Sequence, residues 1–420
     1  MLRDPLLPAA PFLTGGLARD PIALAVNASG GELRTLRARQ VLYRPGRDLI
    51  VRYAATVSWN GGAPVAETLL AGTTTKGAPA GTLPLQAEEI DGMEIGVWRY
   101  PFDPALPGLE TAVTAPRAAE LLDGVLDGVP HLDVRTYRPG RRAVVHAVTE
   151  HGEAYVKVVR PRETAALVAR HEVLTGAGLA VPEVLAHDDD LGVVVLRALP
   201  GDDLRDRLRD RGPLPAASDL LTTLDALRVV DLGAHPRRAP SAVTDARGHA
   251  GLISTVVPRE EQRLAEIVDR IEALAAFEPD LPPAVTVHGD FHEAQLRVDD
   301  AGHVTGLLDV DGATVGDRIE DLATMLGHLA TLALGAKDKR ARIEQYASEL
   351  HDEFARVVDP VALDRRVAAV IVGLATGPFR VQQKAWRKET SRRVALAQQW
   401  VTRAERAADA RGERTLSARS

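Results

Sequence analysis

Hydrophobic and polar residues alternate along the chain between residues 32 and 100, which is the pattern of half-buried strands. The clearest runs are "VLYRPGRDLIVRYAATVSW" at 41–59 and "GMEIGVWRY" at 92–100. Residues 1–30 are rich in proline, glycine and alanine without a clear period, so they predict a mobile lead. Residues 31–120, which end in a proline-punctuated connector and a short helix, are expected to form a β-rich, cap-like N-terminal domain.

A second run of alternating positions covers residues 132–160, and a helical pattern follows at about 162–177. Two further short strands with a turn between them are expected within residues 180–204. Together these elements predict a small β-rich lobe over residues 121–201.

The pattern becomes mainly helical after residue 212. The helix predicted within residues 258–277 has one apolar face, formed by Leu264, Ile267, Val268, Ile271 and Leu274. Two strand-like pieces at 285–310 interrupt the helices. We therefore expect a helical lobe over residues 202–407, a frayed polar tail at 408–420, and an α+β protein overall.

The pentapeptide "YRPGR" occurs at 43–47 and again at 137–141, each time before an alternating apolar run. Two interpretations are open. Either the chain repeats a whole β hairpin, or it uses one turn type twice, because proline followed by glycine suits the middle of a type II turn.

Composition limits the function. The net charge of −7 on 420 residues argues against a general nucleic-acid binder, and the absence of cysteine excludes disulfides, thiolate zinc sites and cysteine nucleophiles. The sequence shows neither a basic-then-apolar leader nor an apolar run of membrane-spanning length. We expect a soluble cytoplasmic protein that binds neither nucleic acid nor membrane; the pattern gives no oligomeric state.

Three segments carry candidate chemistry. In "VHGDFHEAQLRV" (287–298), His288, Asp290 and His292 alternate as metal ligands on one strand face would, or Asp290 acts alone as a base in a loop. The apolar run "GLLD" delivers Asp309 into a glycine-containing loop. Lys157 lies in the middle of the apolar strand "AYVKVV", although this chain uses arginine for most of its cations.

This ordered set resembles the aminoglycoside phosphotransferase and choline kinase branch of the protein-kinase-like fold over about residues 130–400. The resemblance implies a bilobal fold, ATP and Mg²⁺ as cofactors, and phosphoryl transfer to the hydroxyl of a small molecule. It also implies roles for four residues. Lys157 would meet the nucleotide phosphates, Asp290 would be the catalytic aspartate, and Gln295 and Asp309 would hold magnesium.

These residue types suit that chemistry for physical reasons. Phosphoryl transfer depends on positioning and on neutralising phosphate oxygens, and Lys157 offers a compact charge on a strand. Asp290 is suited to accept the proton of the acceptor hydroxyl or to orient it. The carboxylate of Asp309 is a hard oxygen donor for magnesium. The structural alternative for Lys157 is an edge-strand lysine whose charge reaches water.

The sequence departs from the family pattern in two places near the nucleotide. Gln295 stands where most members have asparagine, which keeps the amide oxygen but moves it out by one methylene. "HGDxHxxQ" looks more like actinobacterial maltokinases and glucosamine kinases, which also carry an extra N-terminal domain, and so favours a sugar or amino sugar acceptor. The phosphate-covering loop has a single glycine, Gly140, so we expect Arg141 or Arg142 to assist.

The resemblance leaves the acid that pairs with Lys157 open between Glu172 and Glu163, and we favour Glu172. The segment "VVVLRALPG" resembles the hinge of that fold, where backbone groups near Leu196 and Ala198 would hold adenine.

Three residues are candidates for the acceptor site, and each has a structural alternative. Asp311 either faces the site or caps the turn at the following glycine. His292 either meets substrate or supports the loop, as we expect of His288. Trp386 either stacks on a sugar or packs between helices. Asp317 and Asp321, at a predicted helix start, are expected to cap the helix and fix the loop rather than bind metal.

We therefore expect an ATP-dependent small-molecule kinase whose acceptor is a sugar, an amino sugar or an aminoglycoside-like compound. Two alternatives remain open. One is a catalytically inactive, kinase-like nucleotide-binding module. The other is a metal-dependent hydrolase that uses His288, Asp290 and His292 as ligands.

Overall fold

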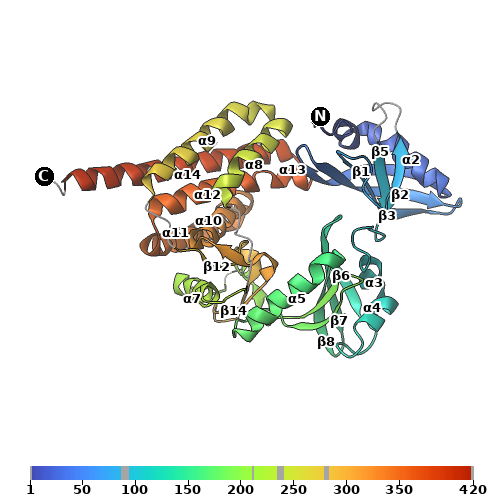
Figure 1. Cartoon of the computed structure of the whole chain (residues 1–420), viewed down its shortest axis with the longest axis horizontal. Helices are drawn as coiled ribbons and strands as arrows, with labels where there is room; N and C mark the ends of the chain where they lie inside the picture. Colours follow the sequence, from blue (N-terminus) through green and yellow to red (C-terminus); the bar gives the residue numbers. More distant parts are fainter. Residues whose placement is uncertain (1, 87–93, 211, 234–240, 279–282, 418–420) are drawn as a thin grey trace. The chain divides into compact units, whose positions relative to one another are not determined.

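The computed structural model describes residues 2–86, 94–210, 212–233, 241–278 and 283–417, and it consists of two compact units. The first unit comprises residues 1–168, 184–198 and 378–386. The second comprises residues 169–183, 199–377 and 387–420. The protein is of the α+β class, because strands dominate the first unit and helices the second (Figure 1).

The elements of the first half, in chain order, are α1 (Ala10–Leu13), α2 (Arg19–Ala28), β1 (Gly31–Arg44), β2 (Asp48–Trp59), β3 (Pro64–Thr74), β4 (Leu83–Gln86), β5 (Glu94–Arg99), α3 (Leu109–Val113), α4 (Ala115–Leu121), β6 (His131–Arg138), β7 (Arg142–Thr149), β8 (Gly152–Val159), α5 (Pro161–Gly176), β9 (Val184–Asp188) and β10 (Val193–Arg197). Those of the second half are β11 (Asp202–Asp203), α6 (Leu204–Arg207), α7 (Ala217–Arg228), α8 (Ala242–Val256), α9 (Glu261–Ala273), β12 (Val285–Val287), β13 (Leu296–Val298), β14 (Val304–Leu307), β15 (Thr314–Gly316), α10 (Arg318–Gly335), α11 (Arg340–Val357), α12 (Pro360–Leu374), α13 (Gly377–Arg380) and α14 (Trp386–Ser417).

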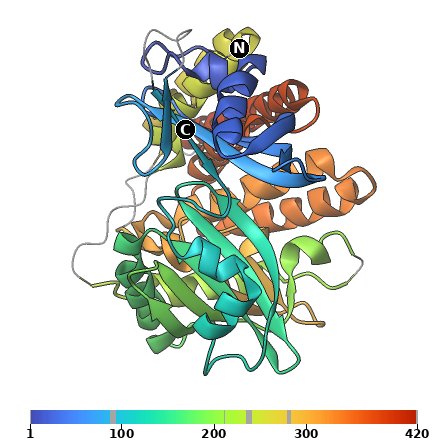
Figure 2. The same cartoon turned by 90° about the vertical axis from the view of Figure 1, so that its right-hand side faces the viewer.

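The prediction of a mobile lead over residues 1–30 is wrong. Helices α1 and α2 form there and contact the first sheet, as Figures 1 and 2 show in dark blue. Leu7, Leu13 and Ile22 are fully buried, although short glycine- and proline-rich stretches hid their periodicity. The apolar side chains of this segment cover the sheet, so it belongs to the N-terminal domain.

The first unit contains two five-stranded antiparallel sheets of the same order. The first is β1-β2-β3-β5-β4 and the second is β6-β7-β8-β10-β9. In both leading hairpins the tyrosine of "YRPGR" pairs with the residue six positions further on. Gly46 and Gly140 have φ values of 63° and 66°, the left-handed region that this turn reserves for glycine. The chain therefore repeats a whole hairpin, together with the sheet behind it.

The two sheets share one hydrophobic core. Leu70 and Trp98 of the first sheet belong to the same buried cluster as Tyr137, Val145 and Val156 of the second. The two sheets, which the sequence separates into a cap and a lobe, therefore pack in one unit, whereas residues 169–183 and 199–201 of the expected lobe belong to the second unit. Mutations in either sheet are expected to affect the stability of both.

The second unit is helical around two small sheets, β11-β13-β14 and β12-β15. The frayed tail expected at 408–420 is wrong for its first part, since α14 continues to Ser417. Arg411 on this helix donates to the carbonyl of Phe277 at 2.7 Å and pairs with Asp359. Ala408 is buried as well, so packing and hydrogen bonds extend the helix beyond residue 407.

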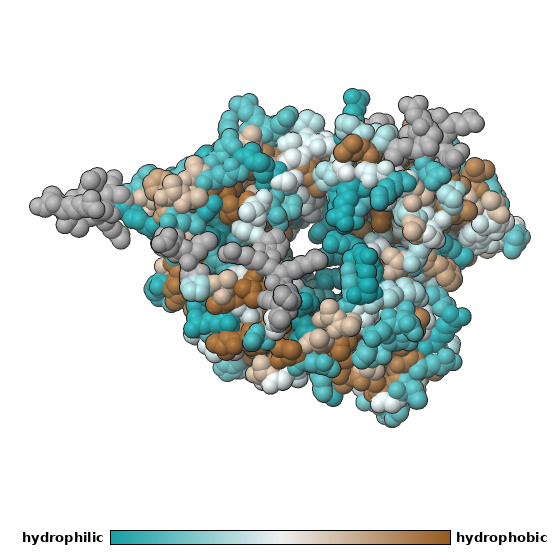
Figure 3. Space-filling view, viewed as in Figure 1, coloured by the Kyte–Doolittle hydropathy of each residue, from teal (hydrophilic) through white to brown (hydrophobic). Residues whose placement is uncertain are grey.

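On the face seen in Figure 3, hydrophobic residues are scattered in small groups among hydrophilic ones. Among the residues that the structure describes, no helix has the length and apolar character needed to cross a membrane.

Candidate active site

Two loops of the second unit lie against each other. Strands β12 and β15 pair on one side of them, and β13 and β14 pair on the other. The backbone nitrogen of Leu308 donates to the carbonyl of Gln295 at 2.7 Å. A side chain at Gly289 would come within 2.9 Å of the carbonyl oxygen of Gly312, so only glycine allows this close approach. The loop that carries Asp290 and the loop that carries Asp309 thus form one rigid platform.

Asp290 follows β12 in a loop, and its side chain is 49% exposed. The fully buried His288 supports this loop: its Nδ1 accepts from the backbone nitrogen of Asp290 at 3.2 Å, and its Nε2 donates to the carbonyl of Leu308 at 2.8 Å. Both ring nitrogens of His288 are therefore used. This confirms the supporting role expected of His288 and excludes it as a metal ligand.

Gln295 and Asp309 are the candidate magnesium ligands. Gln295 ends a short 3-10 turn, η5 (Glu293–Gln295), and its side-chain nitrogen lies 3.2 Å from Nε2 of His292. Asp309 has φ 51° and ψ 44°, a left-handed conformation that is costly for a residue other than glycine and is typical of functional loops. An amide oxygen and a carboxylate suit magnesium chemically.

Asp321, on the first turns of α10, fixes the catalytic loop. Its two carboxylate oxygens accept the backbone N–H groups of His288 at 2.8 Å and Gly289 at 2.9 Å. Complete burial raises the pKa of Asp321, although these N–H donors and His288 act in the opposite direction. Asp317 caps α10 by accepting from the nitrogen of Ile319 at 2.9 Å. Both residues therefore act as the sequence predicts, as cap and loop support.

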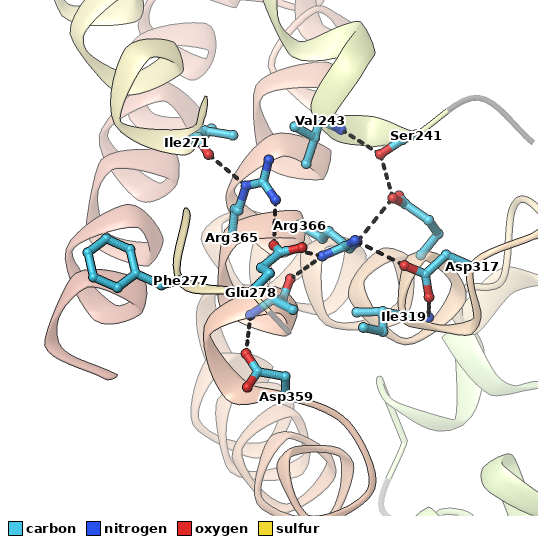
Figure 4. Close-up of polar contacts among 12 residues, drawn as sticks. Ser241, Val243, Ile271, Phe277, Glu278, Asp317, Ile319, Asp359, Arg365 and Arg366 are labelled. Carbon is cyan, nitrogen blue, oxygen red and sulfur yellow. Dashed lines mark hydrogen bonds and ion pairs between the residues drawn. The ribbon is translucent and has the colours of Figure 1, made fainter. Parts of the chain in front are cut away.

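A buried ion network holds the start of α10 in place (Figure 4). Arg366 of α12 donates to Glu278 at 3.0 Å, to Asp317 at 2.9 Å and to Glu320 at 3.2 Å. Glu320 also accepts from the hydroxyl of Ser241, the N-cap of α8. Because Arg366 is only 4% exposed, its charge is balanced by these carboxylates rather than by water. The platform under Asp290 is thus tied to the packing of α8, α10 and α12.

Beneath Asp290 lies a pair of histidines. The rings of His292 and His328 stack with centroids 4.0 Å apart and an angle of 11° between their planes. Burial, followed by the charge on His292, lowers the pKa of His328 to about 3, so its ring is neutral. Glu293 is fully buried beside them. Burial alone would raise the pKa of Glu293, but the neighbouring His292 and Arg205 lower it to about 2.

Asp290, His292 and His328 bring potential ligand atoms within 4.8 Å of one another. Their geometry nevertheless disfavours a transition-metal site. Stacked, nearly parallel imidazoles direct their lone pairs along parallel planes rather than toward one point, and Nε2 of His292 already contacts the amide of Gln295. The metal site suggested by the alternating His-Asp-His pattern is therefore not formed, since His288 points elsewhere. His292 supports Gln295.

Asp311 lies in the short turn η6 (Val310–Gly312), where helix α5 holds it. Arg170 donates to the backbone carbonyl of Asp311 at 2.6 Å, and Nε2 of His171 lies 3.7 Å from its carboxylate. His171 is itself fixed by the carbonyl of Pro182 at 2.7 Å. The second half of α5 thus buttresses the loop that carries Asp309, and Asp311 as an acceptor ligand stays a prediction.

The candidate nucleotide residues of the first unit lie on and around the second sheet. Lys157 is central in β8, 5% exposed, and its backbone pairs with Val144 on one side and Val194 on the other. Burial in a central strand rules out the edge-strand alternative for Lys157. Leu196 is buried in β10, and Ala198 follows that strand.

The turn between β6 and β7 carries Gly140 and Arg141. Arg141 is exposed, whereas the backbone nitrogen of Gly140 donates to the carboxylate of Asp103 at 2.7 Å. Of the two acids considered as partners of Lys157, Glu163 binds Arg160 at 2.5 Å, and Glu172 is exposed on α5. The preference for Glu172 stays a prediction.

Trp386 contacts Phe379 edge-on, with ring centroids 5.0 Å apart and planes at 62°. Phe379 is buried and Trp386 half-buried. The pair packs within residues 378–386, in agreement with the structural alternative, and a role for Trp386 in acceptor binding stays a prediction.

Comparison with known proteins assigns this platform to a family. A family model described as the phosphotransferase enzyme family matches residues 133–357, which is 225 of the 420 residues. The chain belongs to this family. Its members are phosphotransferases, and the match includes Lys157, Asp290, Gln295 and Asp309. A search of curated proteins finds no match.

Solved structures of similar fold include three from this group. Aminoglycoside phosphotransferase APH(4)-Ia, as a thermostable mutant with ADP and hygromycin B, is 16% identical, with a TM-score of 0.46 over 70% of this chain and 98% of that one. A choline/ethanolamine kinase family protein from Mesorhizobium loti is 16% identical, with a TM-score of 0.49 over 71% and 96%. An aminoglycoside-3'-phosphotransferase of type VIII is 22% identical, with a TM-score of 0.42 over 66% and 98%.

The sequence alone missed His328, Glu293 and Asp103. His328 lies on α10 among buried apolar residues, far from the loop in sequence, and nothing local marks it. Glu293 could have been suspected because it lies inside the catalytic segment. Asp103 carried a usable signal, since an Asp-Pro pair precedes both copies of the repeated hairpin, at residues 4–5 and 103–104.

Proposed function

We propose that this phosphotransferase moves the γ-phosphate of ATP to a hydroxyl of a sugar or amino sugar. The observation that carries the proposal is the platform formed by two hydrogen-bonded loops, in which Asp290 is exposed while Gln295 and Asp309 offer oxygen ligands. Family membership supplies the reaction class.

Asp290 acts as the base or orienting group in this proposal. Its carboxylate is exposed to solvent, while His288 and Asp321 hold its backbone, so it can receive an acceptor hydroxyl without moving. The acceptor oxygen donates its proton toward Asp290 as it attacks the γ-phosphorus, and the bond between that phosphorus and the oxygen bridging to the β-phosphate breaks to release ADP. Glu293 is buried nearby and ionised. Its negative charge stabilises the proton that Asp290 receives.

Magnesium, when bound by Gln295 and Asp309, supplies charge neutralisation of the phosphate oxygens. The donor set fits: both side chains present hard oxygen atoms from loops that are hydrogen-bonded to each other. In the first unit, Lys157 is proposed to bind the nucleotide phosphates, and the backbone near Leu196 and Ala198 to bind adenine. Glu172, the acid favoured as partner of Lys157, belongs to the second unit, and that pairing stays a prediction.

Asp311, His292 and Trp386 are the proposed acceptor contacts. Residues 377–389 include Arg380, Lys384 and Lys388, which disfavours a polycationic aminoglycoside relative to a neutral or singly charged sugar. The proposed location is the cytoplasm, where ATP is abundant.

The test is turnover of Mg-ATP by purified protein against a panel of neutral sugars, amino sugars and aminoglycosides. We expect phosphorylation of a sugar or amino sugar and at least about a thousandfold loss of kcat in Asp290→Asn. Asp352→Asn, an exposed aspartate on α11, is the matched control and should be fully active. Binding of ATP without phosphorylation of any acceptor would point instead to an inactive nucleotide-binding module.

A further inference from the structure

Asp103 connects the two sheets of the first unit through the turn between β6 and β7. One oxygen of its carboxylate accepts both the hydroxyl of Tyr137 at 2.9 Å and the backbone nitrogen of Gly140 at 2.7 Å. Its other oxygen accepts from the nitrogen of Ala105 at 3.0 Å. Asp103 is 4% exposed and Tyr137 is 7% exposed. We call this arrangement the second clamp.

The same arrangement occurs once more in the first sheet. Asp4 accepts the hydroxyl of Tyr43 at 2.9 Å and the nitrogen of Gly46 at 2.7 Å on one oxygen, and the nitrogen of Leu6 at 2.9 Å on the other. We call it the first clamp. Both clamps begin with an Asp-Pro pair and are followed by a short helix, α1 or α3, that starts six residues after the aspartate.

The two copies differ where nucleotide chemistry is expected. Lys157 pairs with the third residue of β7, and the third residue of β2, Ile50, pairs with Gly72. Gly72 therefore occupies the register position of the lysine in the first sheet. A Cβ atom there would come within 3.1 Å of the carbonyl oxygen of Leu49, so a side chain at this position would be crowded. The first sheet also has no helix between β3 and β4, where the second has α5.

The second clamp limits which groups of the β6–β7 turn can bind a phosphate. A turn that cradles phosphates does so with free backbone N–H groups, but the N–H of Gly140 is donated to Asp103. Burial and the nearby charge of Asp103 raise the pKa of Tyr137, so its hydroxyl keeps its proton and remains a donor. The turn is thus fixed from below, while the side chain of Arg141 stays exposed above it.

We propose that Asp103 is a positioning residue for nucleotide binding: by holding Tyr137 and Gly140 it fixes the β6–β7 turn, so that Arg141 meets the phosphates with its guanidinium group in place of a glycine-rich backbone cradle. A fixed turn loses less conformational entropy when the nucleotide binds, and a guanidinium group offers several donors to phosphate oxygens. This inference rests on the proposed function, because it takes ATP as the ligand. The first clamp has the same chemistry in a sheet without the lysine and serves as an internal control.

The experiment compares two pairs of matched variants of the full-length protein, Asp103→Ala with Asp4→Ala, and Tyr137→Phe with Tyr43→Phe. The dissociation constant of Mg-ATP is measured by calorimetry, KM for ATP and kcat by turnover, and Tm by thermal unfolding. Loss of the positioning hydrogen bonds should raise the dissociation constant and KM about five- to tenfold in Asp103→Ala and about threefold in Tyr137→Phe, with kcat within about twofold. Asp4→Ala and Tyr43→Phe should lower Tm by similar amounts without weakening ATP binding.

Equal ATP affinity in each matched pair would overturn the inference, because the second clamp would then be purely structural. The Tyr→Phe pair keeps the test decisive if either alanine variant fails to fold, since it removes only one hydrogen bond. Arg141→Gln should weaken ATP binding in the wild type and have little further effect in Asp103→Ala; additive losses would contradict action through Arg141. Wild-type protein that binds no Mg-ATP would instead refute the proposed function itself.

Discussion

The carboxylate of Asp321 accepts a 2.8 Å hydrogen bond from the backbone nitrogen of His288, 33 residues earlier in the chain. A second bond from the next nitrogen, that of Gly289, makes this carboxylate the anchor of the catalytic loop. Helix α10 thus positions the loop that carries Asp290, and the ion network around Arg366 positions α10 in turn. The place of Asp290 therefore depends on helix packing at the start of α10.

Asp321→Asn should therefore lower activity by more than the loss of folded protein alone would cause. Asparagine has a single acceptor oxygen, so one of the two loop N–H groups would face the amide NH₂ group and be left unpaired at a cost of about 1–3 kcal/mol. We expect kcat to fall by about tenfold or more, because the loop that carries Asp290 loses its fixed position. The measurement is steady-state turnover together with Tm.

Asp359→Asn is the control for that substitution, since Asp359 caps α12 by accepting from the nitrogen of Ala362 at 2.9 Å. Asparagine caps a helix about as well as aspartate, so the change chiefly removes the ion pair with Arg411; it should lower Tm and leave kcat unchanged. An Asp321→Asn enzyme with wild-type kcat would show that the loop holds its geometry without the helix.

Substitution of Gln295 tests whether a glutamine serves magnesium here. Gln295→Ala removes the amide oxygen and should raise the magnesium concentration for half-maximal activity by about ten- to a hundredfold. Gln295→Asn shortens the side chain by one methylene and gives up the 3.2 Å contact with His292. Its magnesium concentration for half-maximal activity should lie between those of the wild type and Gln295→Ala. Magnesium titrations of turnover at fixed ATP measure both effects.

Gln345→Ala is the control and should titrate like the wild type, because Gln345 lies on α11 and donates to the exposed Glu349 at 3.0 Å. A magnesium response unchanged by Gln295→Ala would assign the metal to other oxygen atoms of the platform.

The neighbouring loops were predictable from the sequence, and long-range packing was not. Asp290, Gln295 and Asp309 lie in two short loops, and the resemblance of these segments to a known family, together with their spacing, indicated a common site. Asp321 was predicted to fix the loop because it lies early in a predicted helix directly after the Asp309 loop. Such inferences succeed because hydrogen bonds within and between adjacent segments are set by spacing.

Packing against segments that are distant in the sequence explains what the sequence alone did not show. Residues 1–30 looked mobile, yet Leu7 and Leu13 are buried. The sheet that this segment packs against is formed by later residues, so the segment itself gives no sign of the burial. His328 meets His292 only through the packing of α10. The alternating histidines suggested metal ligands because strand geometry was assumed, but β12 ends at Val287 and His288 turns inward.

Removing the charge of Arg366 should strongly destabilise the second unit. Arg366→Ala leaves the buried carboxylates of Glu278, Asp317 and Glu320 without their shared partner, and breaking a buried ion pair in this way costs about 3–5 kcal/mol. Chemical denaturation followed by helical circular dichroism measures the loss. Arg340→Ala, which breaks an exposed pair with Glu344 on α11, should cost less than about 0.5 kcal/mol. Equal losses in the two variants would show that water compensates the charges around Arg366.

His328 should make the protein acid-sensitive. Its pKa is about 3 in the folded protein, against an ordinary 6.5, because burial disfavours the charged ring. Between these values the unfolded chain binds a proton that the folded chain does not, so the free energy of unfolding falls as the pH is lowered from 6.5. One such group removes roughly 2 kcal/mol between pH 6.5 and pH 5.

His328→Phe keeps a ring for His292 to stack on and has no proton to gain. Its free energy of unfolding should therefore depend less on pH than that of the wild type, by up to about 1.4 kcal/mol per pH unit between pH 6 and pH 5. Glu293, with a pKa of about 2 against 4.5 when unfolded, adds acid sensitivity only below about pH 4.5, outside this window. Urea unfolding at pH 7, 6 and 5 separates the two variants, and parallel pH profiles would show that His328 takes up its proton in the folded state.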